Sequence, residues 1–245
     1  MSDILLQTQG LGVSFGGVHA VRDVDFRLER GEIRCLIGPN GAGKSTFFKM
    51  LSGQLRPSRG DIHFKGRPLR GLPTHEVARL GIGIKTQVPS VFEGLDVREN
   101  LLLAAARRRG ADGPAAIADQ ILAQTGLGDV AAAPVNTLAH GQRQWVELGM
   151  ILASRPELVL LDEPAAGMTH QEVRKTADMI RAINRHSTVV VVEHDMAFIR
   201  LIAGRITVFN QGQILAEGGY DDIMAHADVR AAYLGKQGEQ HAQST

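Results

Sequence analysis

The stretch GPNGAGKS, residues 38 to 45, constrains this chain more than any other feature. It matches the pattern G-x-x-x-x-G-K-[ST] of loops that hold phosphate groups. Glycine lets such a loop curl until successive amide N–H groups point at one anion. Lys44 can reach the outer phosphates of a nucleotide, and the Ser45 hydroxyl is placed to ligate Mg²⁺. The loop therefore predicts a nucleotide site.

The segments on either side of this loop have the structure that the motif requires. The apolar run 32–37 predicts a strand that enters the loop, and TFFKMLSG, residues 46 to 53, predicts a helix that leaves it. The positive end of this helix would add to the attraction for phosphate. A chance glycine-rich turn is the alternative, but the order strand, loop, helix favours the nucleotide site.

Composition limits the class of protein. The chain has 245 residues, of which 44% are hydrophobic and 22% charged, as is usual for a globular protein. A net charge of +1 gives no electrostatic reason to expect nucleic acid or an acidic membrane as a partner. The single cysteine, Cys35, lies in an apolar run, which predicts a reduced thiol. Without a signal-peptide pattern or an apolar run near the ~20 residues that span a bilayer, we expect a cytosolic protein.

The N-terminal region predicts two antiparallel strands. Apolar and polar residues alternate over residues 4–28, and Gly16-Gly17 separates the two runs. Phe15 directly precedes this glycine pair. It is either a core residue, the commoner place for phenylalanine, or an exposed platform for a nucleotide base.

Later segments predict a parallel sheet and a separate helical region. The runs 158–161 and 187–192 are mostly apolar, the second with four consecutive valines, which is typical of parallel strands covered on both faces. Residues 88–156 are mostly helical instead. We expect an α/β fold with a mostly parallel sheet, N-terminal antiparallel strands and an inserted helical subdomain. The expected boundaries are 1–87 and 157–245 for the nucleotide-binding core and 88–156 for the inserted subdomain, with a disordered tail at 238–245.

Polar residues follow the predicted strands, at the sheet edge where reacting groups gather in such folds. Asp162 is placed to hold Mg²⁺, directly or through water, and Glu163 can accept a proton from an attacking water. His194 follows the run VVVV, where we interpret it as a sensor of the terminal phosphate. Gln87 ends another short strand. The alternative is that Asp162 and Glu163 only cap the turn before Pro164.

Together these motifs resemble the ATP-binding subunits of ATP-binding-cassette (ABC) transporters over nearly the whole chain. GPNGAGKS, Gln87, LAHGQ at 138–142, LVLLDE at 158–163 and His194 occur in the order and spacing of that family. LAHGQ is similar to the family signature LSGGQ and is the most discriminating of these motifs. In the family, the signature loop of one subunit closes over the phosphate held by the other. The resemblance therefore implies a single ATPase domain, residues 1–245, that works as a head-to-tail pair.

The resemblance also implies ATP and Mg²⁺ as ligands and assigns the site residues. Phe15 becomes the expected adenine-stacking aromatic. The expected catalytic residues are Glu163, His194 and Gln87, and the expected metal ligands are Ser45, Gln87 and Asp162. The residues expected to contact the nucleotide are Phe15, Gly38, Pro39, Asn40, Gly41, Ala42, Gly43, Lys44, Ser45 and Thr46, together with Leu138, Ala139, His140, Gly141 and Gln142 of the signature loop.

A narrower likeness suggests the partners. The segments VPSVFEGLDVRENL, HGQRQWVELGM, DEPAAGMT and AAYLG are similar to ATPases of the branched-chain amino acid and urea (amide) uptake group. This likeness implies a second ATPase subunit, identical or paralogous, two integral-membrane permease subunits and, through them, a substrate-binding protein. It implies a peripheral position on the cytoplasmic face of the inner membrane, without direct contact to nucleic acid.

Three positions depart from the family pattern. Ala139 replaces the signature serine, which removes a hydroxyl donor to the phosphate, and His140 replaces a glycine and could supply a substitute donor. Thr169 stands where the family often has aspartate. We still expect an active ATPase, because neither the phosphate loop nor the predicted metal ligand and base at 162–163 is changed.

Two other functions remain open from the residues. A non-transport cassette protein acting on DNA or ribosomes usually carries two cassettes or a long coiled-coil insertion, whereas only about 50 residues separate Gln87 from Leu138. A phosphate-loop kinase for small molecules would explain neither LAHGQ nor a glutamate directly after the metal aspartate.

Overall fold

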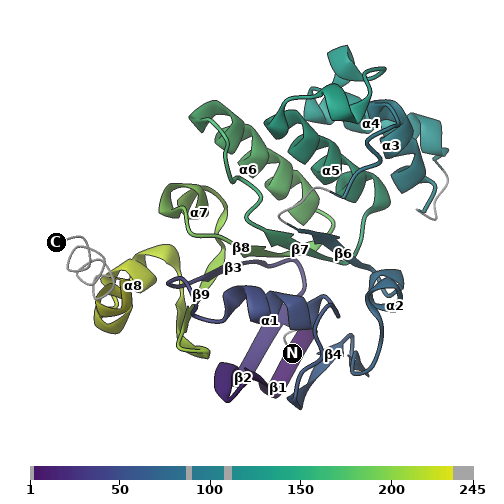
Figure 1. The fold of residues 1–245 in the computed structure, drawn as a ribbon. Coiled ribbons are helices and arrows are strands. Elements are labelled where there is room, and N and C mark those ends of the chain that lie inside the picture. Colours follow the sequence, from purple (N-terminus) through teal and green to yellow (C-terminus); the bar gives the residue numbers. More distant parts are fainter. Residues whose placement is uncertain (1–2, 87–89, 108–111, 234–245) are drawn as a thin grey trace.

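A computed structural model describes residues 3–86, 90–107 and 112–233. The strands form two sheets, with helix α1 between them and the remaining long helices on the far face of the larger sheet (Figure 1). The predicted tail at 238–245 and the predicted site residue Gln87 lie outside the described residues. None of the helices described is long and apolar enough to cross a bilayer.

The larger sheet has six strands in the order β10-β9-β3-β8-β7-β6, parallel except for the edge strand β10. Its strands are β3 (Ile33–Ile37), β6 (Ile82–Lys85), β7 (Leu158–Asp162), β8 (Thr188–Val192), β9 (Arg205–Asn210) and β10 (Gln213–Gly218). This agrees with the mostly parallel sheet expected from the apolar runs. Since β3, β8 and β7 are neighbours, the residues that follow them meet at one edge.

Successive residues of these strands face two different hydrophobic cores. Cys35 and Ile37 pack into a core on the helical face, whereas Leu36 between them packs into the core around α1. The same alternation runs along β7 and β8. Both faces of the strands are therefore covered, which is why their sequences are mostly apolar.

The second sheet is antiparallel, in the order β2-β1-β4-β5. Its strands are β1 (Ile4–Phe15), β2 (Val18–Glu29), β4 (Arg59–Phe64) and β5 (Arg67–Pro68). Phe15 pairs with Val18 across the predicted Gly16-Gly17 turn, so the expected hairpin is confirmed. The side chain of Phe15 is 51% exposed, so the core position, the commoner place for phenylalanine, is wrong. The open tip of the hairpin gives it nothing to pack against.

Eight α-helices are described. Their bounds are α1 (Lys44–Leu51), α2 (Thr74–Arg79), α3 (Val97–Ala105), α4 (Pro114–Thr125), α5 (His140–Ser154), α6 (His170–Asn184), α7 (Met196–Ile202) and α8 (Tyr220–Ala225). Helices α3, α4 and α5 pack on one another and form the helical region expected between the core segments (Figure 1). Helix α3 begins with a reciprocal capping box between Asp96 and Glu99.

Two helix assignments from sequence need correction. The sequence predicts a turn at AHG followed by a helix from Gln142 to Ser154, whereas helix α5 begins at His140, so part of the LAHGQ motif is helical. Helix α7 was not expected. The side chain of Asp195 caps it by accepting hydrogen bonds from the backbone N–H groups of Ala197 and Phe198, a start signal that the neighbouring His194 obscured.

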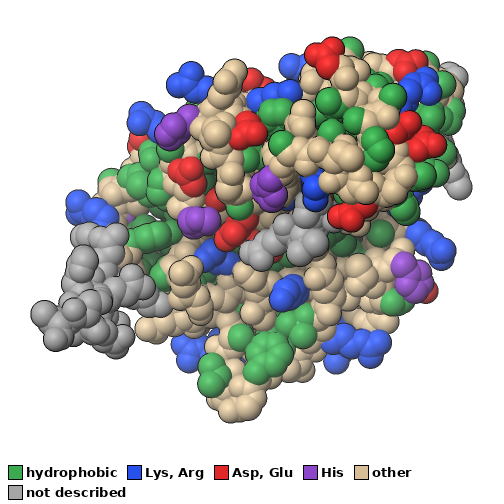
Figure 2. Space-filling view, turned by 45° about the horizontal axis from the view of Figure 1, so that its top comes forward, with side chains coloured by type: hydrophobic (Ala, Val, Ile, Leu, Met, Phe, Trp, Pro, Cys, Tyr) green, Lys and Arg blue, Asp and Glu red, His purple; other side chains and the backbone are tan. Residues whose placement is uncertain are grey.

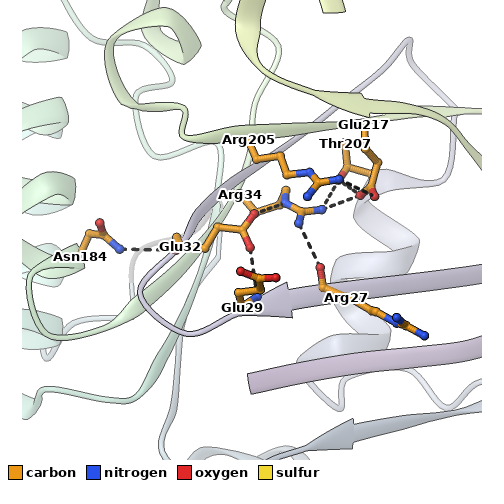
Figure 3. A network of polar contacts seen from close by, with 8 residues as sticks. All are labelled: Arg27, Glu29, Glu32, Arg34, Asn184, Arg205, Thr207 and Glu217. Atoms are coloured by element: carbon orange, nitrogen blue, oxygen red, sulfur yellow. Dashed lines mark hydrogen bonds and ion pairs between the residues drawn. The ribbon is translucent and has the colours of Figure 1, made fainter. Parts of the chain in front are cut away.

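A buried arginine joins the two sheets. Arg34 of β3 is 1% exposed and donates hydrogen bonds to the carbonyl oxygen of Arg27 in β2, to the Thr207 hydroxyl of β9 and to the carboxylates of Glu32 and Glu217 (Figure 3). Each guanidinium nitrogen thus has an acceptor, which a buried charge requires. The network fixes β2 of one sheet against β3, β9 and β10 of the other.

We expect Arg34→Met to lower the free energy of unfolding by about 2–3 kcal/mol, because it strands a carbonyl and two partly buried carboxylates. Arg30→Met is the matched control, since Arg30 pairs with Asp3 and Glu157 at a half-exposed position. The control should lose less than about 1 kcal/mol. Denaturant unfolding measures both, and equal losses would contradict the structural role of Arg34.

Candidate nucleotide site

The loop after β3 has the strained backbone that its glycines permit. Gly38, Gly41 and Gly43 have φ values of 146°, 77° and 104°. A Cβ atom on Gly38 would lie 2.2 Å from the carbonyl oxygen of Phe209, and one on Gly43 would lie 2.5 Å from that of Ala20. Only glycine fits these two positions, so the phosphate-loop pattern reflects both conformation and close packing.

The remaining residues of the loop lie where a ligand could reach them. Lys44 is buried and its Nζ donates to the carbonyl oxygens of Gly38 at 2.6 Å and Pro39 at 3.1 Å. The lysine therefore lies along the inside of the loop. Asn40 and Ser45 are exposed. Since Lys44 begins α1, the free N–H groups of the first helical turn also point at this space.

The phosphate loop also contacts the segment that carries Phe15. The carbonyl oxygen of Ala20, in β2, lies against Gly43. Gly212, between β9 and β10, donates its N–H to the carbonyl oxygen of Ala42 at 2.9 Å. The hairpin tip with the exposed Phe15 is thus held beside the loop, although nothing in the sequence of the hairpin indicates this contact.

Asp162 ends β7 as a buried carboxylate with a free acceptor. Its side chain is 7% exposed, and its Oδ1 has no hydrogen-bond donor among the described residues. Burial and the neighbouring Glu163 raise the pKa of Asp162, while Lys85 and Lys49 act in the opposite direction. A buried carboxylate oxygen without a donor, together with a serine hydroxyl on α1, fits a hard cation such as Mg²⁺.

Glu163 and His194 face each other at the same sheet edge. The Nδ1 of His194 lies 3.4 Å from the Oε1 of Glu163, and the two side chains are 65% and 31% exposed. Glu163 has a left-handed backbone conformation with φ of 46°, and its N–H donates to the carbonyl oxygen of Val192 in β8. This bend turns Glu163 away from the strand direction. Three of the predicted residues, Asp162, Glu163 and His194, are thereby brought together.

Glu193 is a residue of this site that the sequence interpretation missed. It is 2% exposed, and its carboxylate accepts hydrogen bonds from the backbone N–H groups of His194, Asp195 and, at 3.4 Å, Ala165. It therefore ties the segment after Glu163 to the segment that carries His194. Its position at the end of an apolar strand was the available signal, because a charge there needs a buried partner.

The LAHGQ residues lie at the start of α5, against the segment that follows Glu163. A Cβ atom on Gly141 would lie 2.4 Å from Oε1 of Glu172, and the imidazole of His140 lies beside Gly167. Gln142 accepts a hydrogen bond from the N–H of Ala139 at 3.1 Å. The methyl group of Ala139 cannot accept a hydrogen bond from the backbone N–H of Gln142, so only one of the two hydrogen bonds of a capping box is present.

Further side-chain contacts join α5 to α6 and to the segment after Glu163. The indole N–H of Trp145 in α5 donates to the Thr176 hydroxyl of α6 at 3.0 Å, and this hydroxyl lies 3.1 Å from the sulfur of Met168. The ammonium of Lys175 lies over the Trp145 ring at 3.8 Å. The start of α5 and the segment after Glu163 are therefore fixed to each other. No described hydrogen bond joins residues 138–142 to the phosphate loop of the same chain.

Comparison with known proteins identifies this arrangement. A model of the ABC transporter family matches residues 21–166. The chain belongs to this family. A second model, described as a branched-chain amino acid ATP-binding cassette transporter, matches residues 213–239.

Individual relatives match over nearly their whole length. The chain is 37% identical to the high-affinity branched-chain amino acid transport ATP-binding protein LivG of Salmonella typhimurium, covering 96% of this chain and 100% of LivG. It is 35% identical to BraF of Pseudomonas aeruginosa, a protein with the same description, at the same coverage. It is also 34% identical to the lipopolysaccharide export protein LptB of Acidithiobacillus ferridurans, covering 95% and 98% of the chains.

Solved structures show the same fold. The ADP conformation of the cassette MJ1267 has a TM-score of 0.81 at 24% identity and covers 95% of this chain and 99% of its own. A dimeric, post-hydrolysis state of the cassette MJ0796 with ADP and Pi has a TM-score of 0.76 at 24% identity and covers 88% and 98%. This ABC protein therefore has the α/β cassette fold expected from its motifs.

We expect Glu193→Gln to lower kcat for ATP hydrolysis about tenfold, since losing one hydrogen bond to a buried charge costs about 1.5 kcal/mol. The KM for ATP should change less than about threefold, because Glu193 acts on the segments that carry Glu163 and His194 and not on the phosphate loop. Asp178→Asn, on the exposed face of α6, is the control. Steady-state kinetics over a range of ATP concentrations measures both, and a raised KM at unchanged kcat would contradict this role.

Proposed function

We propose that this chain is the ATP-hydrolysing subunit of a membrane ABC importer for a small polar solute, either a branched-chain amino acid or urea or an amide. ATP-driven pairing of two cassettes, head to tail, would power uptake. The observation that carries the ATPase role is the meeting of Glu163, His194 and the buried Asp162 at the sheet edge beside the phosphate loop. The LivG and BraF relatives and the C-terminal family match support the importer class.

Each residue has a role that follows from its position. Glu163 lies at the mouth of the site and accepts the proton of the attacking water. His194 lies 3.4 Å from it, where its imidazole orients the carboxylate and contacts the terminal phosphate. Lys44 leaves the loop carbonyls to bind the outer phosphates, and Phe15 stacks on adenine from the hairpin tip. Gln87, outside the described residues, completes the proposed catalytic set.

Mg²⁺ is the proposed metal, held by Ser45 and Asp162 with help from Gln87. Bound there, it would neutralise the charge of the terminal phosphates. The free Oδ1 of Asp162 supports this role, as does its raised pKa, because a divalent cation replaces the proton that burial favours. The alternative of a small-molecule kinase has less support, because it gives no role to the LAHGQ residues at the start of α5.

A second cassette completes each site in this proposal. Leu138, Ala139, His140, Gly141 and Gln142 make no described hydrogen bond to the phosphate loop of their own chain, which leaves them for the nucleotide of a partner. The dimeric MJ0796 structure supports such a pair. The partner cassette is either a second copy of this chain or a paralogous ATPase subunit of the same transporter.

The permeases are proposed to dock near residues 90–107, on the cytoplasmic face of the membrane. A cavity of about 450 Å³ lies there, and its lining includes the apolar residues Val91, Phe92, Leu103 and Met150 and the charged residues Arg107 and Glu147. Phe92 and Leu103 are 55% and 46% exposed, which is unusual for such large apolar side chains. A substrate-binding protein would act through these permeases.

The nucleic-acid or ribosome alternative has less support. Acidic, basic and histidine side chains are interspersed on the face of the molecule in Figure 2, without the extended basic region that a phosphate backbone requires. The net charge of +1 agrees with this distribution.

We expect Glu163→Gln to bind ATP normally and to lower the hydrolysis rate by about 10²–10⁴, the usual effect of losing a general base. With its chemistry blocked, the variant should accumulate as an ATP-dependent dimer in size-exclusion chromatography. The control is Glu76→Gln, an exposed carboxylate on α2. Unchanged steady-state ATPase activity in Glu163→Gln would refute the base.

We expect Phe92→Asp to reduce co-purification of the chain with its permeases more than about tenfold, because a charge in an apolar interface costs about 2 kcal/mol. Val18→Asp is the matched control, since Val18 is 69% exposed but lies outside the cavity. Equal recovery of both variants with the permeases would contradict docking at this cavity.

A further inference from the structure

Lys85 and Glu147 form a buried ion pair between the central sheet and the helical region. Lys85 ends β6 and is 0% exposed, and Glu147 lies in the middle of α5 and is 3% exposed. Their Nζ and Oε2 atoms are 3.8 Å apart. The Oε2 atom has no hydrogen bond to a described residue, so attraction between the charges is its compensation.

The same two side chains hold both flanks of Gln87. The Nζ of Lys85 donates to the carbonyl oxygen of Thr86, and the Oε1 of Glu147 accepts the N–H of Ser90 at 2.9 Å. The backbone before and after the predicted metal-contacting glutamine is therefore attached to one ion pair. Since Glu147 belongs to α5, the pair also connects these flanks to the helix that begins with the LAHGQ residues.

The pair also balances charge around the metal aspartate. Besides Glu147, the carboxylates of Asp162 and Glu193 act on Lys85 and raise its pKa against the larger, opposite effect of burial. Burial raises the pKa of Glu147 to about 7. The buried carboxylates of α5, β7 and the end of β8 all act on this one ammonium group.

Stability alone does not account for this pair. Removing two charges from water costs several kcal/mol per ion, and apolar residues of similar size are often as stable or more stable at such positions. The neighbouring positions of β6 and α5 are apolar and pack well. Moving the two elements apart would leave two uncompensated buried charges, so the ion pair favours one relative arrangement of β6 and α5.

We propose that Lys85 and Glu147 are positioning residues for ATP hydrolysis. Their ion pair fixes the flanks of residue 87 and the helix α5 to the sheet edge that carries Asp162. An ATP-bound subunit then presents its LAHGQ residues in one orientation to the partner cassette. This inference deepens the proposed ATPase function and rests on it.

The test compares uncharged variants of the full chain. Lys85→Met preserves the length of the side chain, and Glu147→Gln preserves the acceptor for the Ser90 N–H. The double variant Lys85→Met/Glu147→Gln removes both charges and leaves neither partner stranded. We expect it to melt within a few degrees of the unmodified chain, with kcat lowered about tenfold or more and the KM for ATP within about threefold.

The single Glu147→Gln variant guards against a double variant that fails to fold. It should lower kcat at least fivefold with unchanged KM. Arg98→Met/Asp119→Asn is the matched control, because this exposed ion pair joins α3 to α4 within the same helical region. Its kcat should stay within twofold of the unmodified chain.

A distance measurement tests the orientation directly. Cys35 is the only cysteine and is buried, so cysteines introduced at the exposed positions Ala123 in α4 and Arg67 in β5 can be spin-labelled selectively. The measurement uses ATP, the Glu163→Gln background and an excess of unlabelled chain, so that each dimer holds one labelled subunit. The two labels should then give one narrow distance distribution when Lys85 and Glu147 are present, and a broad one in the double variant.

The outcomes separate this inference from the proposed function. An unmodified chain without ATPase activity would refute the function. If the unmodified chain is active but Glu147→Gln or the double variant keeps a normal kcat, only the positioning role is refuted. The same holds if the KM for ATP rises as much as kcat falls, or if the distance distributions with and without the ion pair are equally narrow.

Discussion

The structure depends on the burial of both faces of the central strands. Cys35, Leu36 and Ile37 alternate between two hydrophobic cores, and β7 and β8 repeat the pattern. A charged residue within such a strand needs a partner for every polar group, as Arg34 has, to avoid a large desolvation cost. The other charged residues of the site lie where the strands end. Because the strands are parallel neighbours, those ends meet at one edge. The phosphate loop, Asp162 and Glu193 lie together for this reason.

Concentrating carboxylates at that edge creates an electrostatic problem that the fold resolves locally. Asp162, Glu147 and Glu193 are all buried, and burial raises the pKa of each. Backbone N–H groups compensate Glu193, and Lys85 compensates Glu147 and acts on the other two. One oxygen of Asp162 has no donor, which suits a cation that arrives with the nucleotide. Glu147 and Glu193 are therefore compensated within the chain, whereas one oxygen of Asp162 is left for a ligand.

The signature residues are organised by helix α5 and its contacts with α6. The Trp145, Thr176 and Met168 contacts connect the start of α5 to the segment after Glu163. Ala139 offers no side-chain cap, so the first turn of α5 depends on Gln142 and on packing against Glu172. Ala139 lacks the hydroxyl of a serine, and the neighbouring His140 is exposed.

The sequence by itself determined the phosphate loop, the two sheets, the Gly16-Gly17 hairpin and the polar residues at strand ends. Each of these rests on short-range patterns: steric limits at glycine, two-residue alternation, or apolar runs. Only the tertiary structure decided the exposure of Phe15, the role of Glu193 and the Lys85–Glu147 pair. These depend on contacts between segments far apart in the chain. The partner of a buried charge has no local signature, because it is set by how sheet and helix pack.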